Sequence, residues 1–197
     1  RESLLTSAQP FEAPNWTRDG QALVYNSGGR LYRYDLAAQA ASQIDTGAIV
    51  RNNNDHVLSF DGKMLGVSIH TPDDGGRSVV YKLPAKGGAP VRMTRNSPSY
   101  FHGWSPDGKW MVYTGGRKET PDAKADKYDI YKIPADGGDE IRLTNSPGLS
   151  DGPEFSPDGQ WIYFNSTRSG LMQLWRMRPD GSGQEMVTND AWNNWFP

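Results

Sequence analysis

The 197-residue sequence contains 22 glycines, 14 prolines, seven tryptophans and nine tyrosines, no cysteine, and charges that leave a net of -2 at pH 7. This length is enough for one sizeable core, and the balanced charge lacks the basic footprint that nucleic-acid binding needs. Without cysteine there is neither a disulfide framework nor a thiolate metal site, and without a run of about 18 apolar residues no membrane span is expected.

A four-residue phrase recurs through the chain and sets its organisation. Its copies are Thr17-Arg18-Asp19-Gly20, Ser59-Phe60-Asp61-Gly62, Ser105-Pro106-Asp107-Gly108 and Ser156-Pro157-Asp158-Gly159, at spacings of 42, 46 and 51 residues. Aspartate can bond the neighbouring backbone and glycine accepts a positive φ, so each copy is predicted to be a tight turn between strands. Repetition at this period predicts an array of similar modules.

In chain order, each turn is flanked by residues that favour strands. First strands, ahead of the turns, are predicted at 11–16, 53–58, 99–104 and 150–155. Aromatic and β-branched runs predict second strands at 22–25, 64–67, 110–113 and 161–164. Aromatic and basic pairs mark third strands at 32–33, 81–82, 131–132 and 175–176, and fourth strands are expected at 42–46, 91–94, 141–144 and 185–188.

Four short antiparallel strands in a unit of about 40 to 50 residues are typical of a β-propeller blade, in which twisted sheets pack face to face around a channel. We therefore predict an all-β chain that forms one incomplete propeller domain over residues 1–197. Its blades are expected at about 11–46, 53–94, 99–144 and 150–188, with the start of a further blade at 193–197. The first strand of each blade should line the channel.

The last turn phrase, followed by Trp-Ile-Tyr-Phe-Asn-Ser at 161–166 and Leu-Trp-Arg-Met at 174–177, resembles the WD40-like (PD40) repeats of bacterial TolB-type propellers. The resemblance covers essentially the whole chain and is strongest at 99–144 and 150–188. It implies a six-bladed ring, of which about four blades are present here. We expect either a segment of a longer propeller or a ring completed by self-association, because open sheet edges are prone to aggregate.

The familiar catalytic signatures are absent, among them the nucleophile elbow Gly-x-Ser-x-Gly and the zinc motif His-Glu-x-x-His. Propellers bind ligands at a mouth of the channel, so the candidate ligand-binding residues are polar residues predicted to line it. They are Glu12, Asn54, Asp55, His56, Tyr100, His102, Asp151 and Asn194. Counting back from the turns places His56 and His102 at equivalent positions in adjacent blades.

Histidine beside carboxylates can bind a divalent metal or a sugar hydroxyl, or act as a general base. The chain is also similar to pectin-degrading lyases, in which inner-strand histidines hold a metal, so a divalent metal is worth testing, although no cofactor is expected. The alternative is that these side chains only bond neighbouring carbonyl groups and water.

Two classes of function stay open. The absence of catalytic signatures favours a non-catalytic TolB-like scaffold that binds a protein or small ligand at the channel mouth and loops, including the charged loop at 117–127. The alternative is an enzyme or enzyme domain, either a metal-assisted lyase or hydrolase at the channel or the propeller of a prolyl-oligopeptidase-like peptidase. No nucleic-acid partner is expected, and the sequence is compatible with either the periplasm or the cytoplasm.

Overall fold

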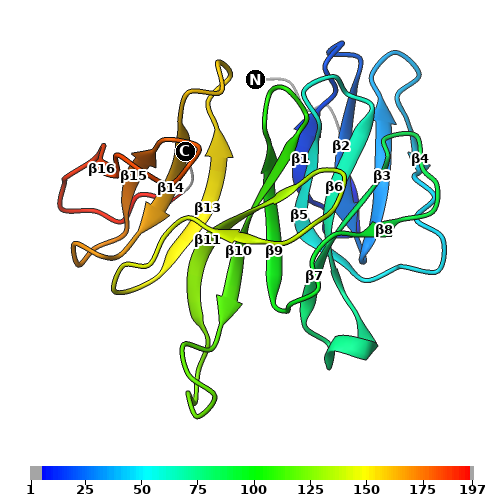
Figure 1. Ribbon diagram of the computed structural model, residues 1–197. Coiled ribbons are helices and arrows are strands. Elements are labelled where there is room, and N and C mark those ends of the chain that lie inside the picture. The colour runs from blue at the N-terminus through cyan, green and yellow to red at the C-terminus, as the bar shows by residue number, and fades with distance from the viewer. Residues whose placement is uncertain (1–5, 196–197) are drawn as a thin grey trace.

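The computed structural model describes residues 6–195, which form four separate four-stranded antiparallel sheets (Figure 1). Blade 1 comprises β1 (Glu12–Trp16), β2 (Ala22–Ser27), β3 (Arg30–Asp35) and β4 (Ala40–Gln43). Blade 2 comprises β5 (Asn52–Leu58), β6 (Met64–His70), β7 (Ser78–Pro84) and β8 (Val91–Arg92), with the 3-10 turn η1 (Pro72–Asp74) between β6 and β7. Blade 3 comprises β9 (Ser99–Trp104), β10 (Trp110–Arg117), β11 (Lys127–Pro134) and β12 (Ile141–Arg142). Blade 4 comprises β13 (Ser150–Phe155), β14 (Ile162–Ser166), β15 (Gln173–Met177) and β16 (Glu185–Met186).

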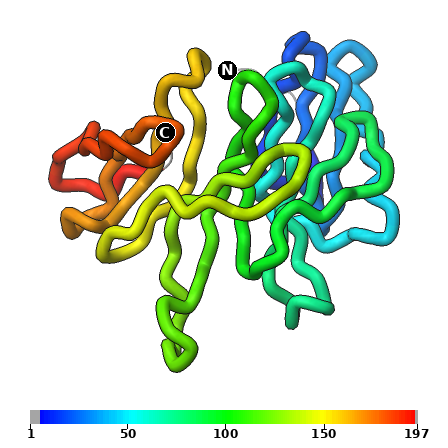
Figure 2. The backbone as a smooth tube through the Cα atoms, in the orientation of Figure 1, coloured from blue at the N-terminus to red at the C-terminus, as the bar shows by residue number. Residues whose placement is uncertain are grey.

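The four blades follow one another in chain order, as the colour gradient of the tube shows (Figure 2). Their first strands are neighbours, because β1 contacts β5, β5 contacts β9 and β9 contacts β13. The all-β propeller architecture predicted from the sequence is thus confirmed. Within the described residues, no helix has the length and apolar character needed to cross a bilayer.

The predicted turns form as the repeated phrase indicates. In blade 3 the Ser105 hydroxyl donates to the Asp107 carboxylate at 2.6 Å, and the same carboxylate accepts the Lys109 amide at 3.1 Å. Gly108 then takes a φ of 70°, which a side chain would strain. The hydrogen bond from Ser105, followed by that from the Lys109 amide, lowers the pKa of Asp107. The turn aspartates therefore have a structural role.

The outer strands differ from the prediction in length and place. They are only two residues long in blades 2, 3 and 4, and in blade 1 the strand is Ala40–Gln43 rather than 42–46. The blade 1 connection lacks the glycine pair of the other blades, and Asp35 pairs at once with Ala40 across a tight turn in which Gln39 has a φ of 49°. Of the further blade expected at 193–197, residues 193–195 lie in no strand, and Phe196 and Pro197 are outside the described residues.

The core lies between the blades rather than within them. The cluster between blades 2 and 3 joins Val80 and Met93 to Phe101, Trp104 and Tyr113, all buried. Comparable buried clusters join blade 1 to blade 2 and blade 3 to blade 4. Each sheet is therefore stabilised mainly by burying its apolar faces against its neighbours.

A repeated polar side chain adds directional contacts to this apolar packing. Each blade has such a side chain directly after the apolar run of its second strand. This side chain forms a hydrogen bond with the backbone of the first strand of the next blade or, in blade 4, of the residues that follow the blade. These contacts are Asn26 Nδ2 to the Asn53 carbonyl at 2.7 Å, the Phe101 amide to Ser68 Oγ at 2.6 Å, the Gly152 amide to Thr114 Oγ1 at 3.3 Å and Asn165 Nδ2 to the Asn194 carbonyl at 2.7 Å. Because these polar groups are buried, their pairing fixes how adjacent blades meet.

Candidate functional site at the channel

A hollow of about 440 Å³ lies at the end of the channel beside the loop at 117–127 that joins β10 to β11. We call it the hairpin-end hollow. Its lining comes from blades 2, 3 and 4, and consists of Asn53, Asn54, Asp55, Tyr100, His102, Thr114, Tyr128, Leu149 and Asp151. Five of the eight residues proposed from the sequence are therefore brought together here: Asn54, Asp55, Tyr100, His102 and Asp151.

His102 and Asp151 face each other across the junction of blades 3 and 4. The Nε2 atom of His102 is 3.5 Å from Oδ1 of Asp151, and their side chains are only 14% and 25% exposed. The same carboxylate oxygen accepts the Thr114 hydroxyl at 2.7 Å and the Gly152 amide at 2.8 Å. The carboxylate is thus held in one orientation by groups from two blades.

The electrostatics of this pair follow from burial and mutual attraction. Burial alone would lower the pKa of His102, but the hydrogen bond to Asp151 and the charges of Asp55, Asp151 and Glu154 outweigh it and raise the pKa. Burial alone would raise the pKa of Asp151, but its contacts with His102 and Thr114 outweigh it and lower the pKa. The geometry therefore favours a protonated imidazole beside an ionised carboxylate.

Asp55 supplies a second carboxylate on the blade 2 side of the hollow. Asn53 Nδ2 donates to Asp55 Oδ2 at 2.9 Å, and the Asp55 amide donates to Asn53 Oδ1 at 2.9 Å. Burial raises the pKa of Asp55 by more than the nearby His102 and the Asn53 amide lower it. The ionised form of Asp55 is thus less well stabilised than that of Asp151.

Two tyrosine rings complete this wall of the hollow. The centroids of Tyr100 and Tyr128 are 6.5 Å apart, at an interplanar angle of 37°. Their rings offer flat apolar surface with a negative face, next to the carboxylates of Asp55 and Asp151. His102 also borders a second hollow of about 520 Å³, which Glu154 and Trp16 help to line, so this residue lies between two open parts of the channel.

The structure does not bring His56 to His102. His56 is 1% exposed, and its Nε2 atom lies 3.4 Å from the carbonyl oxygen of Val24 in blade 1. Burial lowers the pKa of His56, in contrast to that of His102. The equivalence of these histidines expected from counting back from the turns does not hold.

The reason is that the first strands carry bulges at different places. In blade 2, His56 is paired with Val67 and the extra residues precede it, between Asn52 and His56. In blade 3, Phe101 and Gly103 are paired with consecutive residues of β10, which leaves His102 as the additional residue. A shift of one residue turns a side chain to the other face of a strand. His56 thus corresponds in space to Phe101.

Glu12 and Asn194 also lie away from the hairpin-end hollow. Glu12 is exposed on β1, opposite Asn26. The Asn194 side chain donates to Gln173 Oε1 at 3.1 Å and to Asp190 Oδ1 at 3.1 Å, and its amide donates to the Met172 carbonyl at 2.8 Å. Asn194 therefore packs on blade 4, where it receives the repeated contact from Asn165.

Sequence reasoning did not single out Thr114, Tyr128 or Leu149 as site residues. Thr114 follows the second-strand run of blade 3, and it pairs with Tyr100 across the sheet. Tyr128 is the second residue of β11 and pairs with Gly116. If the second and third strands of blade 3 had been predicted three or four residues longer, towards the loop at 117–127, Thr114 and Tyr128 would have been placed beside Tyr100. The sequence prediction missed them because it made these strands too short. Leu149 precedes a first strand and carried no pattern.

The loop at 117–127 is tied down at both ends. Arg117 donates to both carboxylate oxygens of Glu140, at 2.9 and 2.7 Å, and Lys127 donates to Glu119 at 2.9 Å and to Asn145 at 2.8 Å. Asp126 forms an ion pair with Arg77 of blade 2. These contacts hold the loop as a bridge between blades 2 and 3, beside the hairpin-end hollow.

The histidine and carboxylates of this hollow do not form a metal site. Within residues 6–195, no three histidine, cysteine, aspartate or glutamate side chains are grouped so that they could hold a metal ion. With His56 directed into the interface with blade 1, the hollow offers one imidazole, and its best-placed carboxylate is committed to Thr114, Gly152 and His102. The arrangement instead suits recognition of a polar or cationic group.

The fold and the channel site define a protein built of TolB-like β-propeller blades. No family model matches the sequence. An uncharacterized protein of Agrobacterium fabrum is 49% identical over 188 residues, which are 95% of this chain and 61% of that protein. A solved structure assigned as TolB from Agrobacterium tumefaciens is 47% identical with a TM-score of 0.90, over 98% of this chain and 67% of that one. The chain belongs to the family of TolB-like β-propeller proteins.

More distant solved structures share the fold alone. TolB from Acinetobacter baumannii is 21% identical with a TM-score of 0.77, over 98% of this chain and 47% of that one. An oligogalacturonate lyase in complex with manganese is 18% identical with a TM-score of 0.66, over 89% of this chain and 51% of that one. The sequence spans 61% of the length of the curated Agrobacterium relative.

Proposed function

We propose that this chain is a non-catalytic binding propeller that takes a protein or small-molecule partner at the hairpin-end hollow. The observation that carries the proposal is the convergence of Asp55, Asp151, Tyr100 and Tyr128 around an opening of about 440 Å³. Carboxylates and aromatic rings together recognise a positively charged group through charge-assisted hydrogen bonds and cation–π contact. The partner therefore presents a primary ammonium or guanidinium group, as a basic side chain of a protein does.

The two carboxylates contribute differently to such binding. The contacts of Asp151 with Thr114, Gly152 and His102 all involve its Oδ1 atom and fix the carboxylate, so its other oxygen, Oδ2, is the preorganised acceptor. Asp55 has its ionised form disfavoured by burial, so an arriving cation would lower its pKa by stabilising the charged carboxylate. Preorganisation reduces the entropic cost of binding, and the neighbouring loop at 117–127 can add contacts to a protein partner.

The test is a calorimetric titration with tetralysine as the ligand and with N-acetylated, C-amidated tetra-alanine, which carries no charge, as the comparison. We expect tetralysine to bind and Asp55→Asn or Asp151→Asn to weaken it by roughly tenfold, as the loss of a charge-assisted hydrogen bond predicts. Asp73→Asn is the matched control, because Asp73 is an exposed carboxylate in the β6–β7 connection outside the hollow. Equal weakening by Asp73→Asn, or no effect of Asp55→Asn and Asp151→Asn, would contradict the proposal.

A second candidate is an enzyme at the same place, which the contact between His102 and Asp151 and the fold shared with an oligogalacturonate lyase support. In that case His102 would be the proton-transferring group and Asp151 would orient it. The test is incubation with oligogalacturonate, with and without added manganese, while following the absorbance of an unsaturated product. Turnover by the unmodified protein that is lost in His102→Gln would favour the enzyme. An absence of turnover both with and without manganese would exclude this reaction.

A further inference from the structure

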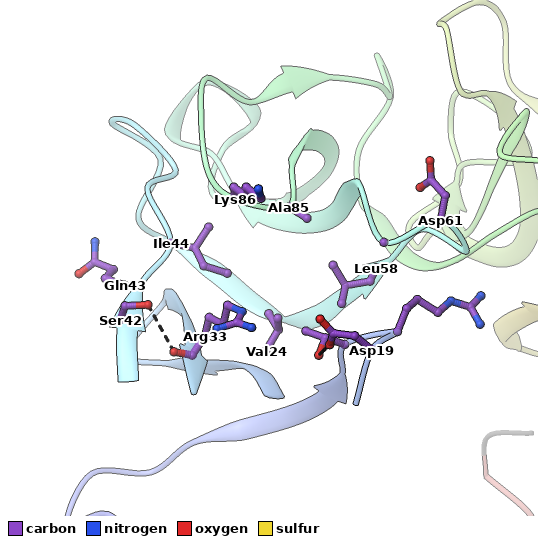
Figure 3. Close-up of a pocket in the computed structure, with 13 residues that line it drawn as sticks. Asp19, Val24, Arg33, Ser42, Gln43, Ile44, Leu58, Asp61, Ala85 and Lys86 are labelled. Atoms are coloured by element: carbon purple, nitrogen blue, oxygen red, sulfur yellow. Dashed lines mark hydrogen bonds between the residues drawn. The ribbon is translucent and has the colours of Figure 1, made fainter. Parts of the chain in front are cut away.

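A larger hollow, of about 590 Å³, lies between blades 1 and 2 at the opposite end of the blades from the hairpin-end hollow. We call it the blade 1–2 hollow. Its apolar wall consists of Val24, Ile44 and Leu58, of which Val24 and Ile44 are buried. Figure 3 shows Arg33 and Lys86 on opposite sides of this wall, with Ile44 and Leu58 between them.

The corresponding places at the other two interfaces are closed by a lysine. Lys82, on the third strand of blade 2, donates its ammonium group to the Ala135 carbonyl of blade 3. Lys132, on the third strand of blade 3, donates to the Pro179 carbonyl of blade 4 at 2.7 Å and lies 4.4 Å from the centroid of the Trp110 ring. In both cases the cation of one blade crosses to the loop between the third and fourth strands of the next.

Charge explains why the crossing occurs there. The residue after each accepting carbonyl is acidic: Asp136 lies 3.9 Å from the Lys82 ammonium, and Asp180 interacts with Lys132. At the interface between blades 1 and 2 the same loop position is Lys86, so the third-strand cation, Arg33, shares the hollow with a like charge instead of a carboxylate. Arg33 instead pairs with Asp35 of its own strand at 3.0 Å. The interface is left with two facing cations and an open volume.

The loop that carries Lys86 is held in place by blade 1. The Gly88 amide donates to the Asp45 carbonyl at 2.9 Å. Gly87 has a φ of 97°, and a side chain there would meet the Asp45 backbone at 3.0 Å. The position of Lys86 at the rim is thus built into the packing of the two blades.

Two carboxylates also line this hollow but are largely committed to their own turns. Asp19 accepts the Thr17 hydroxyl at 2.6 Å and the Gln21 amide at 3.0 Å. Asp61 accepts the Ser59 hydroxyl at 2.6 Å and the Lys63 amide at 3.0 Å. The pKa of Asp19 is lowered first by the Thr17 hydroxyl and the Gln21 amide and also by the charge of Arg33. The three cations that line the hollow, Arg18, Arg33 and Lys86, outnumber these two carboxylates and stand beside an apolar surface.

We propose that the blade 1–2 hollow binds a small organic carboxylate. The anionic group lies between Arg33 and Lys86 and supplies the negative charge that Asp136 and Asp180 supply at the other interfaces. The apolar part of the ligand covers Leu58 and Ala85, which remain partly exposed beside the buried Val24 and Ile44. Charge-assisted hydrogen bonds give the site its preference for an anion, and burial of apolar surface gives it a preference for an aliphatic or aromatic acid over a purely polar one.

The test uses benzoate as the probe and benzamide as its neutral counterpart, with binding followed through the backbone amide resonances of residues 85–88. We expect benzoate to shift these resonances and benzamide to leave them unchanged. Arg33→Gln and Lys86→Gln should each weaken benzoate binding by roughly tenfold, and added salt should weaken it further by screening. Equal binding of benzamide would overturn the proposal.

Two further variants make the result specific to this interface. Lys86→Asp gives the loop the charge found at the other interfaces, and because Lys86 lies in a surface loop the substitution should leave the fold intact. We expect it to abolish benzoate binding. Lys132→Gln removes the equivalent cation from the closed interface of blades 3 and 4 and should leave binding unchanged. Loss of binding in Lys132→Gln to the same extent as in Arg33→Gln, or full binding in Lys86→Asp, would overturn the proposal.

Discussion

The Nε2 atom of His102 lies 3.5 Å from Oδ1 of Asp151, so an imidazole of blade 3 and a carboxylate of blade 4 share one electrostatic site. Thr114 of blade 3 donates its hydroxyl to the same oxygen. Protonation of His102, the ionisation of Asp151 and the contact between the two blades are therefore linked. A group whose pKa is changed by folding must in turn change the stability of the fold with pH.

The first prediction concerns the pKa of His102. Asp151→Asn removes the attraction that keeps this pKa raised against the effect of burial, so the pKa of His102 should fall in the variant. The measurement is an NMR titration of the imidazole resonance in both proteins. The His70 resonance is the reference signal, because His70 contacts Gly76 in the β6–β7 connection and does not line the hairpin-end hollow. An unchanged His102 titration would show that Asp151 does not hold the proton there.

The same pair predicts a pH-dependent stability. Because the folded pKa of His102 is raised above the unfolded value of 6.5, its contribution is fully present below about pH 6.5 and is lost as pH rises through the folded pKa. His102→Gln should therefore cost more stability at pH 5.5 than at pH 9, as measured by urea unfolding at both values. A larger cost at pH 9 would contradict the sign of the shift.

The second prediction tests the polar contact between blades 3 and 4. Thr114 is 2% exposed, and Thr114→Val keeps its shape while it removes the donor to Asp151 and the acceptor for the Gly152 amide. The Gly152 amide and the Asp151 carboxylate still contact each other in this variant, so the loss of the two Thr114 contacts should lower the free energy of unfolding by about 1–1.5 kcal/mol. Thr120→Val, at an exposed position of the loop at 117–127, should change it by less than about 0.5 kcal/mol. Equal effects in the two variants would show that the Thr114 contact is not stabilising.

The sequence was sufficient for the architecture because the fold depends on repeated local signals. The turn phrases and the second-strand runs occur in all four blades. Each turn is satisfied by hydrogen bonds within a few residues, as at Ser105 and Asp107, and each second strand pairs with the strands on either side of it in the same blade. The site depends instead on where each first strand carries its bulge. That position placed His102 in the channel and His56 against Val24, and it is set by packing between blades rather than by a residue pattern.

The third prediction concerns a close approach between blades that the spacing of the repeats does not reveal. A Cβ atom on Gly66 of β6 would lie 2.2 Å from the Phe101 ring of blade 3. Gly66→Ala should therefore destabilise the protein by about 1–3 kcal/mol through overpacking of this core, as measured by urea unfolding. Gly103→Ala is the control, since its Cβ would meet its nearest neighbours at 3.4 Å. The double variant Gly66→Ala with Phe101→Leu places a smaller side chain opposite the new methyl group and should recover part of the lost stability. If no stability is recovered, overpacking against Phe101 is not the cause of the destabilisation.

The final prediction concerns the mostly buried ion pair of Glu140 and Arg117 at the base of the loop at 117–127. Burial alone would raise the pKa of Glu140, but hydrogen bonds from Arg117 and Tyr113 outweigh it and lower the pKa. The stability that this carboxylate contributes is thus present above its unfolded pKa near 4.5 and is lost as pH falls through the lower folded value. Glu140→Gln leaves the Arg117 guanidinium without its charged partner and should cost about 3–5 kcal/mol at pH 7, the range seen when one partner of a buried pair is removed.

Acid should reduce this difference, because the wild-type carboxylate becomes protonated below its folded pKa while the amide that replaces it in Glu140→Gln does not titrate. The measurement is urea unfolding of both proteins between pH 7 and pH 3, with the two free energies converging at the acid end. Asp139→Asn is the matched control, since the neighbouring Asp139 is 94% exposed in its weak pair with Arg95 and its substitution should change stability little at either pH. A cost for Glu140→Gln that stays constant down to pH 3 would show that the pair contributes by shape rather than by charge.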